Sequence, residues 1–190
     1  EYNYYTMKIR KYQANDKLNC RNICLLTAPS TNDERKKQIL LNLYNDYYTE
    51  QEPQNCFVLD DDGIAVGYII TSADFNEYSA KFKSIYLPEL KKLSLSEYAI
   101  KRLSLSLEKR IAKKYPSHLH IDILPEYTGK GFGGKLIDLA CENLAASDSK
   151  GIFLGVSYFN KKAVKFYKNH GFTVKLTIFP FVRYMAKSFD

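Results

Sequence analysis

The sequence predicts a mixed α/β (α+β) fold built as one domain over residues 1–190, and three observations support this prediction. Segments with the two-residue alternation of strands are interleaved with segments of helical periodicity. A glycine-rich loop, residues 125–135, stands between one strand segment and one helix segment. The chain is 45% hydrophobic and has no internal repeat, so its length suits a single core.

The N-terminal part of the chain predicts one strand and two helices. Residues 7–12 alternate apolar and charged side chains, which is the pattern of a half-buried strand. Asp16 is placed to cap the first helix, and the second helix begins near Glu34. The first helix contains Leu18, Ile23, Cys24 and Leu26, and the second has Ile39, Leu40, Leu43, Tyr44 and Tyr47 on one face.

A strand hairpin and a helical insertion follow. Residues 56–59 and 64–71 predict paired strands, because Asp61-Asp62-Gly63 between them has the composition of a hairpin turn. Residues 74–117 predict a helical insertion of two helices, the first ended or kinked by Pro88. The second also contains a short alternating run, but the length of its pattern favours a helix. The apolar faces are formed by Phe75, Tyr78, Phe82 and Ile85 and by Ile100, Leu103, Leu107 and Ile111.

The last part of the chain alternates strands and helices. Residues 118–124 predict the strand before the glycine loop, and the continuously apolar residues 152–156 predict a strand buried on both sides. Asn160 caps a helix that Gly171 ends, and a terminal hairpin follows. The inward faces of the two helices are formed by Leu136, Leu139, Ala140 and Leu144 and by Ala163, Phe166, Tyr167 and His170.

Composition and charge argue against several classes of protein. The net charge is +7, but the lysines are spread over many predicted helices and no arginine-rich tract alternates with aromatic residues, so no nucleic-acid partner is expected. No apolar run is long enough to span a membrane, and residues 1–6 lack the pattern of a secretory signal. Cys20, Cys24, Cys56 and Cys141 are not followed by a second pair at metal-ligand spacing. They predict unpaired thiols in a reducing compartment, hence no metal site and a cytoplasmic location.

The glycine loop predicts an anion site, because a helix N-terminus offers free amides and the positive end of its dipole. Its glycines from Gly129 to Gly134 have the spacing of a dinucleotide fingerprint, but that fingerprint needs an acidic residue where the next strand ends, at Val156-Ser157. The loop also resembles the phosphate loop of nucleotide hydrolases, but Leu136 stands where a hydroxyl must hold magnesium.

A third interpretation also explains the residues downstream. Residues 128–133 match the loop (Gln/Arg)-x-x-Gly-x-Gly except that Thr128 takes the first place. Residues 160–172 match Asn-x-x-Ala-x-x-Phe-Tyr-x-x-x-Gly-Phe. On these two motifs the chain resembles the GNAT superfamily of acyl-CoA-dependent N-acyltransferases. Residues 118–125, together with the insertion, are similar to the acetyltransferase-like domain appended to some O-GlcNAc hydrolases.

The resemblance implies a fold and an activity. The fold would be a GNAT-like mixed, mostly antiparallel central sheet flanked by helices, with the helical insertion between strands 3 and 4. The activity would be transfer of an acetyl group from acetyl-CoA to a primary amine by direct attack, with a small-molecule or peptide amine as acceptor. The alternative is a non-catalytic module that binds coenzyme A or a partner through the same cleft. The sequence leaves a homodimer open.

The resemblance places the cofactor on the glycine loop. The pyrophosphate would lie on the loop's backbone amides, and the pantetheine arm would pair with the preceding strand as an extra strand would. Two loop lysines are placed to neutralise phosphate. The expected cofactor-binding residues are Ile123, Leu124, Thr128, Gly129, Lys130, Gly131, Phe132, Gly133, Gly134, Lys135, Asn160 and Tyr167.

The resemblance and the chemistry also suggest catalytic residues. Tyr167 matches the family's tyrosine and is the expected proton donor to the leaving thiolate. His118, His120 and Asp122 share one face of the strand before the loop, and His120 with Asp122 could act as base and orienter. Purely structural roles for these residues, or a water chain ending on Glu126 or Asp74, stay open.

The acceptor is expected to meet residues from segments that border the acceptor side in this fold. Tyr48, Glu50, Asp74 and Tyr78 lie in such segments, and the carboxylates among them would favour a cationic amine. The insertion could cap the pocket and exclude water. An ordinary surface position is the alternative for each of these residues.

Overall fold

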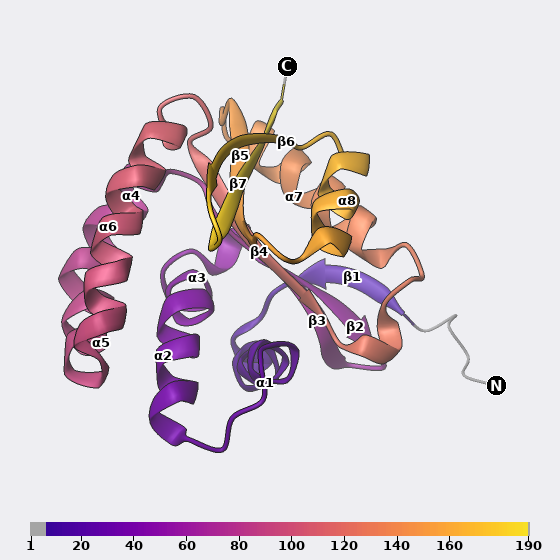
Figure 1. The fold of residues 1–190 in the computed structure, drawn as a ribbon. Coiled ribbons are helices and arrows are strands. Elements are labelled where there is room, and N and C mark those ends of the chain that lie inside the picture. Colours follow the sequence, from indigo (N-terminus) through magenta and orange to yellow (C-terminus); the bar gives the residue numbers. More distant parts are fainter. Residues whose placement is uncertain (1–6, 190) are drawn as a thin grey trace.

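The computed structural model describes residues 7–189, and its framework is one seven-stranded sheet (Figure 1). The strands are β1 (Lys8–Lys11), β2 (Phe57–Asp61), β3 (Ile64–Ser72), β4 (Ser117–Ile123), β5 (Gly151–Ser157), β6 (Thr173–Ile178) and β7 (Val182–Ser188). They lie in the order β1-β2-β3-β4-β5-β7-β6, and β4 and β5 are the parallel pair in an otherwise antiparallel sheet. The predicted mixed, mostly antiparallel sheet is confirmed.

Helices cover both faces of this sheet. They are α1 (Lys17–Thr27), α2 (Glu34–Tyr44), α3 (Asp46–Gln51), α4 (Phe75–Lys81), α5 (Leu87–Leu93), α6 (Leu95–Ala112), α7 (Phe132–Ala145) and α8 (Lys161–Asn169). In Figure 1, α4, α5 and α6 stack beside α2 and α3, whereas α7 and α8 lie together on the other side. The helical segment between β3 and β4 has the place expected for the insertion.

The core consists of two clusters of buried side chains, one on each face of the sheet. Successive side chains of a strand point to opposite faces. Tyr68 and Ile70 of β3 therefore join the cluster under α1 to α6, whereas Ile69 joins the cluster under α7. The four cysteines are all buried and not bonded to one another.

The parallel strands β4 and β5 separate soon after they begin. They pair at Ser117 with Ile152 and at His118 with Phe153. Beyond these residues, β4 continues beside β3 and β5 continues beside β7. From Leu119 onwards, the edge of β4 that faces β5 therefore borders an opening in the sheet.

The structure corrects two predictions in the N-terminal part. The expected second helix breaks at Asn45, whose side chain donates a hydrogen bond to the carbonyl of Cys20 at 3.3 Å. Asp16 precedes α1 but does not cap it with its side chain. Its carboxylate instead accepts hydrogen bonds from Arg10 at 2.6 and 2.8 Å, because a charged partner binds it more strongly than a helix amide does.

The structure also corrects the insertion. Of the two outcomes expected at Pro88, an end of the helix is wrong, because a wider π-type turn, Phe82–Tyr86, adapts the helix before the residue that lacks an amide. The run continues as α5. The expected apolar face of α6 is wrong at Ile100 and Leu103, which are 60% and 63% exposed. Leu105 is buried in their place, and Ile85 is also exposed.

Three local predictions are confirmed. Asp62 and Gly63 both have positive φ in the turn between β2 and β3. The side chain of Asn160 accepts a hydrogen bond from the amide of Ala163 at 3.0 Å and so caps α8. Gly171 follows α8 with a φ of 85°.

None of the helices within residues 7–189 combines the length and the apolar character that crossing a membrane requires. The same residues contain no cluster of three or more histidine, cysteine and acidic side chains suited to a metal ion. The expectation about a secretory signal concerns residues 1–6, which lie outside the described residues.

Candidate functional site

The glycine loop leads directly into α7 and offers an anion site. Gly129 and Gly131 have positive φ of 77° and 82°, which glycine adopts without strain. Gly131 is the residue before α7, and its carbonyl accepts from the amide of Lys135 at 3.3 Å. The amides of the helix's first turn, before Lys135, have no carbonyl of a preceding turn to bind, and they carry the positive end of the helix dipole. Such an arrangement binds a phosphate group.

The first turn of α7 packs tightly against α8 at two glycines. A Cβ atom at Gly133 would lie 3.1 Å from Cζ of Phe166, and one at Gly134 would lie 2.5 Å from Cε1 of His170. A side chain at Gly134 would therefore displace the ring of His170, the residue that follows α8. The two glycines hold α8 beside the loop, where it forms one wall of a cleft of about 650 Å³.

This cleft, which we call the loop cleft, contains most of the expected cofactor-binding residues. They are Ile123, Thr128, Gly129, Gly131, Phe132, Gly133, Gly134, Asn160 and Tyr167, and they come from β4, the loop, α7 and α8. The free edge of β4 borders the same opening. An anion site joined to an elongated cleft and an unpaired strand edge fits a nucleotide with a pantetheine arm.

Leu124, Lys130 and Lys135 do not line the loop cleft. The amide of Leu124 donates to the carbonyl of Val66 at 3.0 Å, so it is already used in pairing with β3. Lys130 Nζ donates to the carbonyl of Glu126 at 2.6 Å, and Lys135 Nζ lies 5.6 Å from the centre of the Phe132 ring. Contact with a phosphate requires these lysines to leave those positions.

Tyr167 of α8 and Asp122 of β4 both line the loop cleft and interact electrostatically. Burial, and then the negative charge of Asp122, raises the pKa of Tyr167 above its ordinary value. Burial also raises the pKa of Asp122 to about 6, against the effect of a hydrogen bond from Tyr68 at 2.6 Å. The cleft therefore contains a phenol that keeps its proton at neutral pH and a carboxylate whose pKa of about 6 lies near neutral pH.

A second cavity, of about 400 Å³, opens where β4 and β5 separate, and we call it the strand-gap cavity. Leu119 and His120 of β4 line it, next in sequence to residues of β4 that line the loop cleft. The other walls come from residues 153–157, from α2 and α3, from β7 and from α6. Among the rings that line it are those of Tyr48 and Tyr184.

The two histidines of β4 are neutral in this cavity. Burial, and then the charge of Lys101, lowers the pKa of His120 to about 3. Burial also lowers the pKa of His118 well below its ordinary value, and its Nε2 shares a hydrogen bond of 2.8 Å with the hydroxyl of Tyr48. Asp122 is bonded to Tyr68 rather than to His120, so the structure does not join His120 and Asp122 as base and orienter.

The sequence suggested that the insertion caps the acceptor pocket, but the residues of α6 that line the strand-gap cavity were not predicted. Glu97, Lys101, Ser104 and Glu108 recur on one side of this helix and all line the cavity. Their spacing of four, three and four residues is visible in the sequence, but it is the ordinary pattern of a solvated helix face. Nothing in one sequence distinguishes a polar helix face that meets water from one that meets a cavity.

The expected acceptor-binding residues are divided by the structure. Tyr48 lines the strand-gap cavity, and Tyr78 is buried behind it with its ring centre 4.3 Å from that of His118. Glu50 and Asp74 line neither cavity. Asp74 caps α4.

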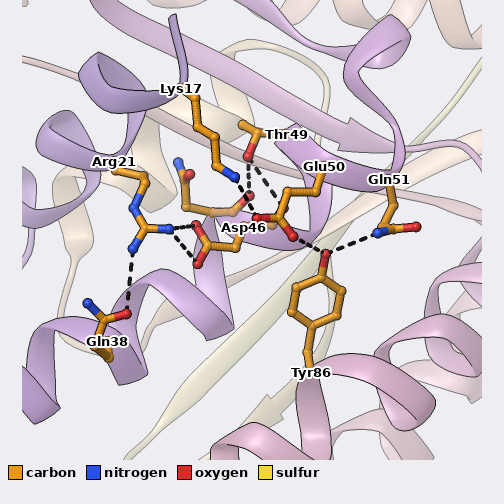
Figure 2. Close-up of polar contacts among 9 residues, drawn as sticks. Lys17, Arg21, Gln38, Asp46, Thr49, Glu50, Gln51 and Tyr86 are labelled. Carbon is orange, nitrogen blue, oxygen red and sulfur yellow. Dashed lines mark hydrogen bonds and ion pairs between the residues drawn. The ribbon is translucent and has the colours of Figure 1, made fainter. Parts of the chain in front are cut away.

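Glu50 belongs to a polar network between α1, α3 and the π-type turn (Figure 2). Its carboxylate accepts hydrogen bonds from Lys17 at 2.7 Å and from Tyr86 at 2.7 Å. Figure 2 shows the neighbouring Asp46 paired with Arg21, at 2.9 Å. The structure thus gives Glu50 a role in joining α1 and α3 to the insertion.

Comparisons with known proteins agree with this architecture. A family model described as the acetyltransferase (GNAT) family matches residues 21–172. The crystal structure of SsHAT superposes with a TM-score of 0.82 and 27% sequence identity, over 96% of this chain and 98% of that one.

More distant structures share the fold. YncA from Salmonella typhimurium, solved with acetyl-CoA, has a TM-score of 0.58 and 15% identity, over 97% of this chain and 95% of that one. PaiA N-acetyltransferase from Thermoplasma acidophilum, solved with coenzyme A, has a TM-score of 0.61 and 15% identity, over 96% and 99%.

Proposed function

This chain belongs to the acetyltransferase (GNAT) family, and we propose that it transfers an acetyl group from acetyl-CoA to a primary amine by direct attack. The observation that carries the proposal is the pair of cavities lined by successive residues of β4, where it parts from β5. One contains the anion site and the tyrosine of the family motif, and the other is a ring-lined pocket. Two reactants can approach each other through the opening in the sheet.

The cofactor is acetyl-CoA, which supplies an acetyl group on a thioester whose sulfur leaves as a thiolate. The residues of the loop cleft fit it, because the free amides between Gly129 and Gly134 suit the pyrophosphate. The edge of β4 near Ile123 suits the amides of the pantetheine arm. Asn160 lines the same cleft while it caps α8.

Tyr167 is proposed to give a hydrogen bond, and then its proton, to the departing sulfur. Its raised pKa keeps the hydroxyl protonated until it is needed. Part of that rise comes from the negative charge of Asp122. When Asp122 accepts a proton, this contribution disappears, the pKa of Tyr167 falls, and Tyr167 becomes a stronger acid than it was before. Proton uptake at Asp122 and proton release at Tyr167 are thus coupled in a favourable direction.

Asp122 is proposed as the base, in place of His120. A pKa of about 6 leaves most of the carboxylate ionised at pH 7 and still able to accept a proton. His120, with a pKa of about 3, is too weak a base for an ammonium group. Its ring, 5.2 Å from that of Tyr48, would instead help to shape the acceptor pocket.

The strand-gap cavity is proposed as the acceptor site. Its volume of about 400 Å³ and its cover by α6 favour a small-molecule amine over a protein chain. The cytoplasmic location expected from the sequence is kept as part of the proposal, and the four unbonded cysteines support it.

A non-catalytic module that binds coenzyme A is the second candidate. Two observations favour it: the weak basicity of His120, and Thr128 in the first loop position, where its hydroxyl donates to the carbonyl of Pro125 at 2.8 Å. Either candidate binds acetyl-CoA. They differ in turnover.

The test is release of coenzyme A by the purified protein from acetyl-CoA in the presence of a panel of small primary amines. Amines that raise the melting temperature at saturating acetyl-CoA would be assayed first. If the protein is an enzyme, it should release coenzyme A in the presence of at least one of these amines. Tight binding of acetyl-CoA without release over the whole panel would favour the module.

A further inference from the structure

Lys101 holds an unusual position for a lysine in this protein. Its side chain is 14% exposed, and it lines the strand-gap cavity. Its Nζ lies 5.4 Å from the ring centre of Tyr78, 5.1 Å from that of Phe82 and 3.8 Å from Oε2 of Glu108. Burying an ammonium group is unfavourable unless opposite charges or hydrogen bonds compensate its charge.

The charge of the cavity is set by three residues of α6: Glu97, Lys101 and Glu108. The other titratable groups that face Lys101 come from the other elements around it, and they stay neutral near pH 7. Burial raises the pKa of the tyrosines and lowers the pKa of the histidines among them. They are Tyr44 of α2, Tyr48 of α3, Tyr78 of α4, His118 and His120 of β4, and Tyr184 of β7.

An amine acceptor must lose a proton before it can attack a thioester. Without Lys101, two carboxylates would face the cavity alone, and they would favour the ammonium form of a bound amine. With Lys101 in place, its positive charge offsets one of the two negative charges. The protonation state of the acceptor therefore depends on this lysine.

We propose that Lys101 favours the unprotonated form of the bound acceptor amine by offsetting one of the two carboxylates, Glu97 and Glu108, across the strand-gap cavity. The inference rests on the proposed function, because it takes this cavity as the acceptor site. The bound amine therefore loses its extra proton more readily, and Asp122, the proposed base, accepts it. The nitrogen lone pair is then available for attack.

The histidines of β4 report the same effect. The charge of Lys101 contributes, after burial, to the low pKa of His120. It contributes in the same direction at His118. An amine beside these rings experiences the same positive charge.

The test compares two amines in three variants. Lys101→Met removes the charge, Lys101→Arg keeps it, and Glu97→Gln removes one opposing charge. The first amine is benzylamine, which is protonated at pH 7. The second is 2,2,2-trifluoroethylamine, which is already neutral at that pH. Acetyl-CoA affinity and the melting temperature of each variant verify that it is folded.

For benzylamine, Lys101→Met is expected to move the acid limb of kcat to higher pH by about one unit, which is about a tenfold loss on that limb. Lys101→Arg should keep the wild-type profile, and Glu97→Gln should move it to lower pH. For 2,2,2-trifluoroethylamine, the loss in kcat caused by Lys101→Met should be much smaller than the loss for benzylamine. Equal losses for both amines would mean that Lys101 only supports the fold, and would overturn the inference.

A second measurement does not depend on turnover. In an NMR titration of the imidazoles, His120 should have a pKa at least about one unit higher in Lys101→Met than in Lys101→Arg. If wild-type protein binds acetyl-CoA but acetylates neither amine, the proposed function fails for these acceptors, and this titration alone decides the inference. An unchanged pKa of His120 overturns it.

Discussion

Replacing Gly131 by alanine tests whether the conformation of the glycine loop holds the cofactor. Gly131 has a φ of 82°, and a Cβ atom there would have no other atom within 4 Å. The substitution therefore causes no clash, and its effect is limited to backbone strain of about 1–2 kcal/mol. The loop can relieve this strain by moving to a negative φ, which would turn its amides away from the pyrophosphate.

Binding of acetyl-CoA to Gly131→Ala must then restore the strained conformation. We expect the affinity to fall by up to the same 1–2 kcal/mol, which is about 5- to 30-fold in Kd. Calorimetric titration with acetyl-CoA measures this change, and thermal unfolding measures stability alongside it.

Gly63→Ala is the matched control. Gly63 has a φ of 88°, and a Cβ atom there would likewise have no other atom within 4 Å, but it lies in the turn between β2 and β3. The control substitution should lower the stability by a similar amount and leave the Kd unchanged. An equal Kd for the two variants would show that the conformation at Gly131 does not hold the cofactor.

Substitutions at three further positions test other parts of the structure. Burial raises the pKa of Asp122 from 3.8 to about 6, so its charged form destabilises the fold above about pH 6 and this effect fades as the pH falls towards 4. Asp122→Asn should therefore raise the free energy of unfolding by about 1–2 kcal/mol at pH 7 and not at pH 4, and it should lower kcat. A gain in stability that does not depend on pH would contradict the raised pKa of Asp122. Glu52 is buried and accepts four hydrogen bonds, so Glu52→Ala should lower the free energy of unfolding, measured in urea, by at least about 3 kcal/mol. A loss below about 1 kcal/mol would mean that these four hydrogen bonds contribute little to stability. Asn160→Ala should lower stability by about 1 kcal/mol in thermal unfolding and Asn160→Ser should keep most of it, whereas equal losses would show that the cap at Ala163 contributes little.

The order of strands and helices was predictable, because each element has a local signal. The turn at Asp62 and Gly63, the cap at Asn160 and the end at Gly171 depend on the backbone preferences of single residues. Those preferences act within a few residues, so one sequence contains them. The glycine loop is predictable for the same reason.

Predictions failed where a residue bonds to a distant segment. Asp16 pairs with Arg10, and Asn45 bonds to the carbonyl of Cys20. On α6, Leu103 is exposed because the helix turns its polar side to the strand-gap cavity, and Ile100 is exposed at the border of that cavity. A helix period shows which residues share a face, but not what that face meets.

The same distinction applies to the site. Tyr167 and the loop glycines belong to short motifs and were predicted to line the cofactor site, and they line the loop cleft. The choice between His120 and Asp122 as base depends on burial and on Lys101, which is 19 residues from His120 in sequence. That contact arises from the packing of the insertion, which no local pattern describes.

The most direct test of the proposed acetyl transfer is the single-turnover rate of Tyr167→Phe at saturating acetyl-CoA, with the best acceptor of the amine panel. The substitution removes the hydroxyl and keeps the ring that packs 5.7 Å from Phe172. We predict a rate roughly 10²- to 10⁴-fold lower, with the Kd for acetyl-CoA within about threefold of wild type. A rate equal to that of the wild type would contradict the role proposed for Tyr167 and the transfer chemistry built on it.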